Sequence, residues 1–390
     1  MAENDFGPAP ELGFTVLRIG LLSAAFPPDF DGIGDYTYWL ASALAQSGVE
    51  TSVWTSIGKQ RLACEGVEVN PFFDSNKPQS VEKLPEILEK GRSIDWLVVE
   101  YNPFGYGKWG YCPWLVRMLR RLKRSGRTRV AVMFHETQVP DRPFKLWVMR
   151  QWQSRQLRDL SRLADTIFVS TTRWESEIKA VWPKAVCHHL PVGSNLPCSK
   201  LSREAAREAL GISPDTLVLG MFGSSHPSRM TDWMGAAVRG AANVHQNALV
   251  LYVGKDGKEF REVCAGFPFK DEGPLAAADV ADRLRAMDIL ISPFIDGLST
   301  RRGSAIAGFQ HGLAVASTWA DHTDALLRND SPPNLILASR DDLPAFIEGI
   351  RKWILLKWQQ GERGRDEMEA FFERYFAWPV IAQKTIDCLR

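Results

Sequence analysis

Short apolar runs alternate with amphipathic segments along the chain, and this alternation predicts a parallel sheet covered by helices. Residues 16–23 form an apolar run that ends in a loop of Pro, Asp and Gly, and residues 36–46 follow with helical spacing up to Gly48. Uninterrupted apolar runs of this length are typical of parallel strands buried on both faces. Strand followed by helix, repeated, indicates an α/β fold with helices on both sides of the sheet. The same pattern predicts further strands at 51–55, 95–100, 129–134 and 165–170.

The alternation is interrupted at residues 191–197 and then resumes. This segment reads P-V-G-S-N-L-P, has turn-forming residues without periodicity, and is predicted to be a hinge. An amphipathic helix is expected at 201–210, and helical patterns dominate from residue 341 to the C-terminus. Two α/β halves of nearly equal size result, which we predict as an N-terminal domain of residues 1–195 and a C-terminal domain of residues 196–376. The second half has predicted strands at 216–222, 248–253, 288–293 and 313–317.

Length and composition agree with two globular domains. The 390 residues are too many for one compact core. Hydrophobic residues make up 45% and charged residues 24%, as in ordinary globular proteins, and the formal net charge of +1 gives no overall attraction to nucleic acid. The N-terminus has no secretory pattern, and no apolar run approaches the ~18 residues of a membrane span. We therefore expect a cytoplasmic protein without a nucleic-acid partner.

A loop with two glycines follows the first predicted strand and opens a helix; it reads P-P-D-F-D-G-I-G-D-Y-T. Gly32 and Gly34 permit close backbone approach, and a helix N-terminus offers free N–H groups and the positive end of its dipole. The loop therefore suits an anionic group such as a diphosphate, or it is a tight turn with Asp35 as the helix N-cap. Its spacing lacks the third small residue of the dinucleotide-binding fingerprint.

A histidine stands directly after the predicted strand at 129–134. Because ligands of doubly wound sheets bind at the carboxyl ends of the strands, His135 is positioned to hydrogen-bond a sugar hydroxyl or to share a developing charge. The alternative is a core histidine with satisfied hydrogen bonds. The pair His188 and His189 has no other metal-type residue at ligand spacing, and the six cysteines match no zinc pattern, so no metal is expected.

A second loop of small residues joins a predicted strand to a helix in the C-terminal half; it reads G-M-F-G-S-S-H-P-S-R. Its backbone N–H groups, the hydroxyls of Ser224 and Ser225 and the cation of Arg229 form an arrangement that suits a phosphate. A plain connecting loop is the alternative.

Residues 293–318 carry the strongest functional signal, with the sequence P-F-I-D-G-L-S-T-R-R-G-S-A-I-A-G-F-Q-H-G-L-A-V-A-S-T. A helix is expected to begin at Arg301 and Arg302 and to end at Gly312. Cations at a helix N-terminus are unfavourable without an anion, so the two arginines imply an anionic ligand or neighbouring carboxylates. Ordinary surface arginines are the alternative. The other candidates of this segment are Asp296, just past a predicted strand, and Ser304 within the helix. The loop residues Gly297, Leu298, Ser299 and Thr300 are also candidates, because their backbone N–H groups are expected to be free and to point ahead of the helix.

A cationic stretch precedes the predicted strand at 129–134. Between residues 102 and 134 no residue is acidic and eight are basic. Apolar residues recur with helical spacing in 114–124, which predicts a cationic amphipathic helix. Such a helix contacts anionic lipid or an anionic acceptor, or it is a core-packed helix with a solvated basic face. Peripheral contact with the inner face of the membrane through residues 108–129 is therefore one expectation.

These motifs together resemble the retaining GT-B glycosyltransferases of family 4, and the resemblance runs through nearly the whole chain. The first glycine loop is similar to the glycine loop of that family. Its acceptor-side segment and histidine resemble E-Y-N-P-F-G-Y-G and F-H-E, and its interdomain segment resembles P-V-G-S-N. Its donor-binding motif and last helix resemble P-F-I-D-G-L-S-T-R-R-G-S and F-A-W-P-V-I-A-Q-K-T-I. The resemblance implies an α/β protein of two facing Rossmann-like domains, with residues 377–390 returning as a helix to the N-terminal domain.

The resemblance also implies roles for single residues. Gly34 approaches the donor phosphates, His135 contacts the transferred sugar near its anomeric carbon, and Arg229 replaces a family lysine on the diphosphate. The implied catalytic residues are His135, Arg229 and Asp296. The implied donor-binding residues are Gly32, Gly34, Ser224, Ser225, Arg229, Asp296, Gly297, Leu298, Ser299, Thr300, Arg302 and Ser304.

The chain departs from the family pattern at three places. Asp296 and Ser304 stand where the family has two glutamates, which meet the sugar hydroxyls and the ribose. The arginine that usually follows the first strand of the C-terminal domain is absent, and Phe222 and Gly223 stand there instead. We hypothesise that Arg302 supplies the missing charge.

The implied reaction is loss of a nucleoside diphosphate from a sugar carbon, with negative charge developing on the phosphates. Preorganised cations and N–H groups stabilise that charge, and Arg229, Arg302 and the Gly34 amide are expected to do so. No cofactor is expected. The partners are a UDP- or GDP-sugar donor and a sugar, lipid-linked or small-molecule acceptor. The alternatives are an epimerase or phosphorylase on the same fold, and a non-catalytic nucleotide-sugar binding protein.

Overall fold

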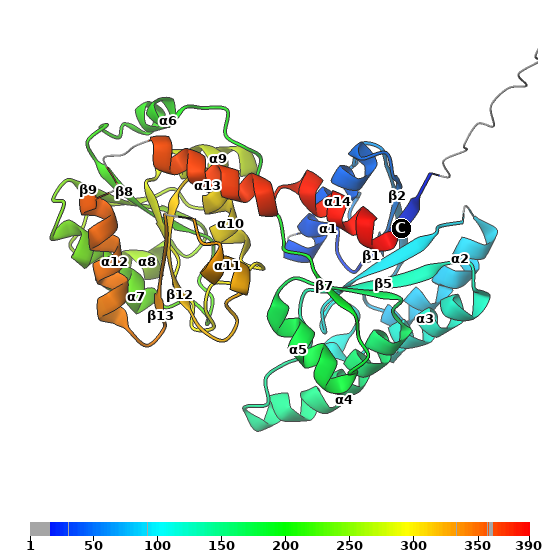
Figure 1. Ribbon diagram of the computed structural model, residues 1–390. Coiled ribbons are helices and arrows are strands. Elements are labelled where there is room, and N and C mark those ends of the chain that lie inside the picture. The colour runs from blue at the N-terminus through cyan, green and yellow to red at the C-terminus, as the bar shows by residue number, and fades with distance from the viewer. Residues whose placement is uncertain (1–15, 30, 92, 333, 357, 359–361) are drawn as a thin grey trace, which may run out of the picture.

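The computed structural model describes residues 16–29, 31–91, 93–332, 334–356, 358 and 362–390, and the structural statements below concern these residues. Two α/β domains, each built on a parallel sheet, face one another (Figure 1). The first sheet has the strand order β3-β2-β1-β4-β5-β6-β7, and the second has the order β10-β9-β8-β11-β12-β13. Both orders reverse beside the first strand of the domain, and this is the edge at which doubly wound sheets bind ligands.

The N-terminal half contains β1 Arg18–Ser23, α1 Gly32–Gln46, β2 Glu50–Ser56, β3 Val67–Phe73, the 3-10 helix η1 Pro78–Lys83, α2 Leu84–Lys90, β4 Trp96–Tyr101, η2 Lys108–Gly110, α3 Pro113–Ser125, β5 Arg129–Phe134, α4 Phe144–Leu163, β6 Thr166–Val169, α5 Thr172–Val181 and β7 Cys187–His189. The C-terminal half contains α6 Arg203–Leu210, β8 Leu217–Phe222, α7 Thr231–Ala242, β9 Ala248–Val253, α8 Gly257–Val263, β10 Phe269–Asp271, α9 Ala277–Ala286, β11 Ile289–Ile291, α10 Gly303–Gln310, β12 Ala314–Trp319, α11 Ala325–Asn329, β13 Leu335–Ser339, α12 Leu343–Leu356, α13 Glu362–Tyr375 and α14 Trp378–Leu389.

Each strand predicted from an apolar run is present, within two residues of its predicted limits. Alternate residues of the inner strands are buried on opposite faces of the sheet. Leu97 and Val99 of β4 belong to one apolar cluster, whereas Trp96 and Val98 belong to another. Helices therefore cover both faces, as the uninterrupted apolar runs predict. The strands that no predicted apolar run marks, β3, β7, β10 and β13, each lie at the edge of a sheet.

The last helix returns to the N-terminal domain, as predicted. Figure 1 shows α14, in red, beside the blue α1. Ile381 and Leu389 of α14 join the buried cluster that covers one face of the first sheet, and the Trp96 indole donates a 2.6 Å hydrogen bond to the Leu389 carbonyl. The Trp378 indole contacts the segment 191–197, the predicted hinge, and donates to the Ser194 carbonyl at 2.7 Å. The C-terminus therefore fastens the two domains to one another.

Candidate functional site

A half-buried arginine, Arg229, stands at the carboxyl edge of the second sheet. Nη2 of Arg229 donates to the Phe222 carbonyl at 2.7 Å and to Ser304 Oγ at 3.3 Å. Its Nη1 is buried and has no hydrogen-bond partner among the described residues. Burial, helped by the nearby cation of Arg302, lowers the pKa of Arg229 to about 10. Gly223 has φ +98°, and a Cβ there would lie 2.9 Å from the Arg229 guanidinium. Glycine at that position therefore leaves the room that the arginine fills.

Two further arginines converge on the carboxylate of Asp296. Arg301 Nη2 lies 3.1 Å from Asp296 Oδ2, and Arg302 Nη2 lies 2.6 Å from the same oxygen and also contacts Oδ1. Burial alone would raise the pKa of Asp296, but Arg302 and Arg301 hold it below its usual value. Neighbouring carboxylates, one of the two predicted explanations for these arginines, are therefore present. The predicted helix start at Arg301 and Arg302 is wrong, because α10 begins at Gly303.

The arginine cluster has more positive than negative charge. Arg229, Arg301 and Arg302 are accompanied by two carboxylates, those of Asp296 and of Glu136, whose Oε1 lies 3.4 Å from Arg301. Arg229 forms no ion pair with a described carboxylate. One cation of the cluster is thus uncompensated in the part of the chain that the structure describes.

The N-terminus of α10 is uncapped and lies beside this cation. No side chain caps α10, and its first turn has no acidic residue. A Cβ at Gly303 would meet no atom within 4 Å, and Ser304 in the same turn contacts Arg229. The free N–H groups and dipole of a helix N-terminus favour an anion, and so does an unpaired guanidinium. Together they form an anion-binding arrangement on the C-terminal side of the cleft.

The loop before α10 does not offer the free amides expected of it. The N–H groups of Gly297, Leu298 and Thr300 donate respectively to the Phe294 carbonyl, the Thr318 carbonyl and the Asp324 carboxylate. Leu298 belongs to an apolar core cluster, and Ser299 and Thr300 are buried. The expectation of free amides is therefore wrong for three of these four residues. Gly297 has φ +84°, and a Cβ there would lie 2.3 Å from Thr323 Oγ1, so the turn itself requires glycine.

In the first glycine loop, the N-cap is Asp31 and not Asp35. The carboxylate of Asp31 accepts from the Ile33 amide at 2.9 Å and from the Gly34 amide at 2.8 Å. A Cβ at Gly34 would lie 3.1 Å from the backbone of the β1–α1 loop, whereas one at Gly32 would meet no atom within 4 Å. The free amide expected at Gly34 is thus already bonded, and Gly32 is the glycine that borders open space.

In the second predicted phosphate loop, a backbone amide is likewise already bonded to a carboxylate. The Ser225 amide donates to Asp256 Oδ2 at 2.6 Å. Ser224 is exposed in the same loop. Of the predicted members of this loop, Arg229 is the one that the structure brings to the arginine cluster, and the role of the two serines stays a prediction.

His135 is half of a buried pair that the sequence reasoning missed. Its Nε2 lies 2.8 Å from Glu100 Oε2, and the other oxygen of Glu100 has no hydrogen-bond partner among the described residues. Burial raises the pKa of Glu100, although the hydrogen bond and charge of His135 oppose the shift. The Tyr36 ring meets the His135 ring edge-on at 4.7 Å. The available signal was the lone acid in an otherwise apolar strand, W-L-V-V-E-Y.

A buried carboxylate joins the two domains beside the arginine cluster. Asp324, from the loop before α11, accepts from the Thr171 hydroxyl at 2.9 Å and from the Thr172 amide at 2.7 Å, both at the start of α5. Its other oxygen accepts from the Thr300 amide at 2.8 Å and from the Thr300 hydroxyl at 2.9 Å. The same hydroxyl lies 2.8 Å from His189 Nε2 in β7. No motif in the sequence points to Asp324.

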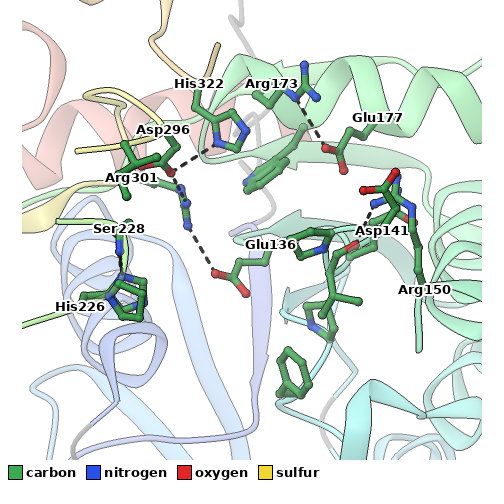
Figure 2. A pocket seen from close by; sticks show the side chains of 18 of the residues that line it. Glu136, Asp141, Arg150, Arg173, Glu177, His226, Ser228, Asp296, Arg301 and His322 are labelled. Atoms are coloured by element: carbon green, nitrogen blue, oxygen red, sulfur yellow. Dashed lines mark hydrogen bonds and ion pairs between the residues drawn. The ribbon is translucent and has the colours of Figure 1, made fainter. Parts of the chain in front are cut away.

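Two cavities lie between the domains, and the Glu136–Arg301 ion pair borders both. The larger, of about 800 Å³, is lined by Asp296, Arg302 and His322 from the C-terminal half and by Phe104, Arg150 and Arg173 from the N-terminal half. Figure 2 shows Glu136 reaching from the N-terminal half toward Arg301, with Asp296 and His322 beyond it. The smaller, of about 380 Å³, is lined by Gly32, Tyr36, His135, Ser170, Asn195 and Gly303. His135 and the α10 N-terminus thus border one cavity.

The basic helix is present as α3, but its cations are largely paired. Arg117 and Arg121 lie 2.6 and 3.7 Å from Glu82, Arg120 lies 3.0 Å from Asp159, and Lys123 lies 2.6 Å from Asp165. The apolar side of α3 is buried in the domain core. The solvated basic face, one of the predicted explanations, therefore describes this helix.

The described residues contain neither a metal-ligand cluster nor a membrane-spanning helix. No group of three or more His, Cys, Asp or Glu side chains is arranged to hold a metal ion there. No described helix combines the length and the apolar character needed to span a membrane.

Comparison with solved structures identifies the fold. Sucrose-phosphate synthase from Thermosynechococcus elongatus superimposes with a TM-score of 0.72 at 15% identity, over 95% of this chain and 98% of that one. HepE from Anabaena, solved in complex with UDP and glucose, gives 0.68 at 14% identity over 96% and 99%. WaaG, a glycosyltransferase involved in lipopolysaccharide biosynthesis, gives 0.65 at 13% identity over 95% and 99%. No family model and no curated protein sequence matches the chain. With two facing Rossmann-like domains and a returning last helix, this chain has the GT-B fold that these glycosyltransferases have.

Proposed function

We propose that the protein is a glycosyltransferase that moves a sugar from a nucleotide-sugar to an acceptor hydroxyl. The observation that carries the proposal is Arg229, which forms no ion pair with a described carboxylate and whose buried Nη1 has no hydrogen-bond partner there, beside the uncapped N-terminus of α10. The diphosphate of a nucleotide-sugar supplies negative charge to the one uncompensated cation and to the uncapped helix N-terminus. Arg302, already beside Arg229, adds a second cation to the same leaving group.

In this proposal the sugar lies between the arginines and His135. The α10 N-terminus and His135 border the same cavity, which supports a position for the sugar of that donor near the histidine. The larger cavity, on the other side of the Glu136–Arg301 pair, receives the acceptor. GT-B structures solved with UDP, such as HepE, support the choice of a UDP-sugar, with a GDP-sugar as the second candidate.

Membership of family 4, retention of anomeric configuration and independence of metal ions belong to the proposal as well. Family membership and retention rest on the sequence resemblance, and metal independence rests on the lack of a metal-ligand pattern in the sequence. A cytoplasmic location is also part of the proposal. Retention is consistent with a site in which no carboxylate is required as nucleophile, because the donor diphosphate serves as the proton partner of the acceptor. The predicted membrane contact through residues 108–129 gains no support from α3, because four of the cations of this helix already form ion pairs with acidic neighbours.

A thermal-shift screen against UDP-, GDP-, ADP- and dTDP-sugars, followed by an assay for released nucleoside diphosphate, tests the proposal. A ligand that binds only the native state raises the melting temperature by mass action. Arg229→Ala should lower kcat/KM by about 10²-fold or more, as loss of one transition-state donor does. The matched control is Arg239→Ala, which removes an exposed guanidinium of α7 that also donates to a carbonyl.

Three outcomes would count against the transferase. Turnover of Arg229→Ala within about threefold of the parent would remove the assigned role of that residue. Isomerised donor in the absence of acceptor would identify an epimerase. Donor binding without turnover on any acceptor would identify a non-catalytic binding protein.

A further inference from the structure

Aromatic side chains gather on the surface of the N-terminal domain where α4 begins. Phe144 and Trp147 in the first turn of α4 are 76% and 46% exposed, and their rings stack at 5.7 Å. Val148, also exposed, continues the stripe along the helix. Figure 1 shows that this end of α4 projects beyond the rest of the domain. Solvent-exposed aromatic residues on a projecting helix turn are not explained by packing within the chain.

A second segment extends this aromatic surface. Trp109 and Tyr111, in and after η2, are 66% and 50% exposed. They are joined to α4 through Trp152, whose indole donates to the Trp109 carbonyl at 3.1 Å and whose ring lies 6.4 Å from that of Tyr111. Trp152 lies one turn beyond Val148 on α4, so the two segments form one continuous surface. We call Trp109, Tyr111, Phe144, Trp147 and Val148 the aromatic patch.

Trp109 combines an unusual backbone conformation with an exposed side chain. Trp109 has φ 57°, in the left-handed region that non-glycine residues rarely adopt. Such strain persists where the surrounding structure imposes it, and it concentrates at functional positions. Here it accompanies an indole that gains little burial within the domain.

The charges around the aromatic patch are positive. Lys108, Arg142 and Lys145 flank it, are exposed, and form no ion pair with a described carboxylate. From residue 137 to residue 158 the acidic residue is Asp141, whereas five residues are basic. The first turn of α4 also carries Lys145 and no acid, which is unfavourable against the helix dipole unless an external anion is present.

We infer that the aromatic patch docks on the surface of an anionic lipid bilayer. Aromatic rings enter the interfacial region of a bilayer, and unpaired lysines and arginines beside them bind anionic headgroups. This surface overlaps the predicted segment 108–129 at Lys108, Trp109 and Tyr111 but does not include α3. The cations of α3 are engaged by Glu82, Asp159 and Asp165, whereas those beside the patch form no ion pair with a described carboxylate. The inference stands independently of the proposed transferase activity. Phe104 and Asp141 line the larger cavity next to the patch, so the docked protein presents that cavity to the membrane.

Co-sedimentation of the full chain with large vesicles tests this inference. Vesicles of phosphatidylcholine with one-third phosphatidylglycerol are compared with vesicles of phosphatidylcholine alone, at low and at physiological salt. The parent should bind the anionic vesicles and not the neutral ones. Phe144→Ser with Trp147→Ser should weaken binding by at least about tenfold, and Lys145→Glu by about fivefold or more. The matched control is Leu355→Ser with Leu356→Ser, which removes two exposed apolar side chains of α12 in the other domain.

Three results would overturn the inference. They are no binding of the parent to anionic vesicles, equal loss in the α12 control, and unchanged binding of the Phe144/Trp147 variant. Sedimentation velocity provides a fourth: a parent dimer that this variant converts to monomer would identify a second copy of the chain as the partner. Nucleotide-sugar binding by the same variant should equal that of the parent, so failure of docking and failure of the proposed function are distinguishable.

Discussion

Arg229→Met should make the ligand-free protein more stable while it removes donor binding. Burial lowers the pKa of Arg229 from 12.5 to about 10. One pKa unit corresponds to about 1.4 kcal/mol, so keeping this guanidinium charged in the folded protein costs about 3 kcal/mol. Methionine keeps the apolar stem but loses the 2.7 Å hydrogen bond to the Phe222 carbonyl, at a cost of about 1 to 2 kcal/mol. The net gain is about 1 to 2 kcal/mol of unfolding free energy.

Thermal unfolding measures this gain. A change of 1 kcal/mol shifts the melting temperature of a domain of this size by about 2 to 4 °C, so we expect a rise of about 4 °C without ligand. At pH values below its folded-state pKa of about 10, the guanidinium is charged in both the folded and the unfolded protein. The rise in melting temperature should therefore be the same from about pH 6 to pH 9. The nucleotide-sugar that raises the melting temperature of the parent should leave that of the variant unchanged.

Arg239→Met is the matched control, because its exposed guanidinium donates to the Val263 carbonyl and has no buried charge to relieve. Its melting temperature should stay within about 1 °C of the parent, as surface substitutions usually do. A ligand-free Arg229→Met protein that melts at or below the parent temperature would refute the reasoning. The cation would then be compensated within the chain, and it would not be held for an anion.

Two further predictions concern buried carboxylates. Asp324→Ala should cost about 3 to 5 kcal/mol of unfolding free energy and should speed proteolysis of residues 191–197, because hydrogen bonds from both domains lose their acceptor. The control is Asp321→Ala, at an exposed carboxylate. Equal rates of proteolysis in the two variants would contradict this prediction. Burial raises the pKa of Glu100, so the folded protein holds the proton of this carboxyl more tightly than the unfolded protein does. Protonated Glu100 therefore contributes stability at low pH, and this contribution is lost as pH rises through and above the ordinary Glu range. Glu100→Gln should flatten that part of the stability–pH curve, and parallel curves for parent and variant would exclude the effect.

The sequence predicted the inner strands and the location of the arginine cluster because both leave a local signal. Strands such as 129–134 are buried on both faces and appear as apolar runs. The edge strand β3, V-E-V-N-P-F-F, is half exposed and broken by proline, so no apolar run marks it. Arg301 and Arg302 lie beside a carboxylate, as one of the predicted explanations has it, and that carboxylate is the nearby Asp296. The second partner of Arg301, Glu136, is far away in the chain and left no such signal.

The missed parts of the site depend on contacts between distant segments. Asp324 lies 153 residues from Thr171, and the hydrogen bond between them joins the two domains. Either Asp31 or Asp35 has the chemistry of an N-cap, and the choice was decided by where α1 begins. With the helix starting at Gly32, the carboxylate of Asp31 reaches the free amides, and Asp35 is left inside the first turn, where burial raises its pKa to about 6.

In the proposed donor site, the groups that remain open to an anion are therefore mainly side chains. In the loops where the sequence suggested backbone amides for the phosphates, Asp31 occupies the Gly34 amide, Asp256 the Ser225 amide and Asp324 the Thr300 amide. The uncapped start of α10 and the arginines beside it are what remain for a diphosphate. Guanidinium groups stay charged at every physiological pH, so donor binding should depend on ionic strength much more than on pH. In the proposed donor site, Arg302 supplies charge from a different position than the arginine that the resemblance implies after β8, where Phe222 and Gly223 stand.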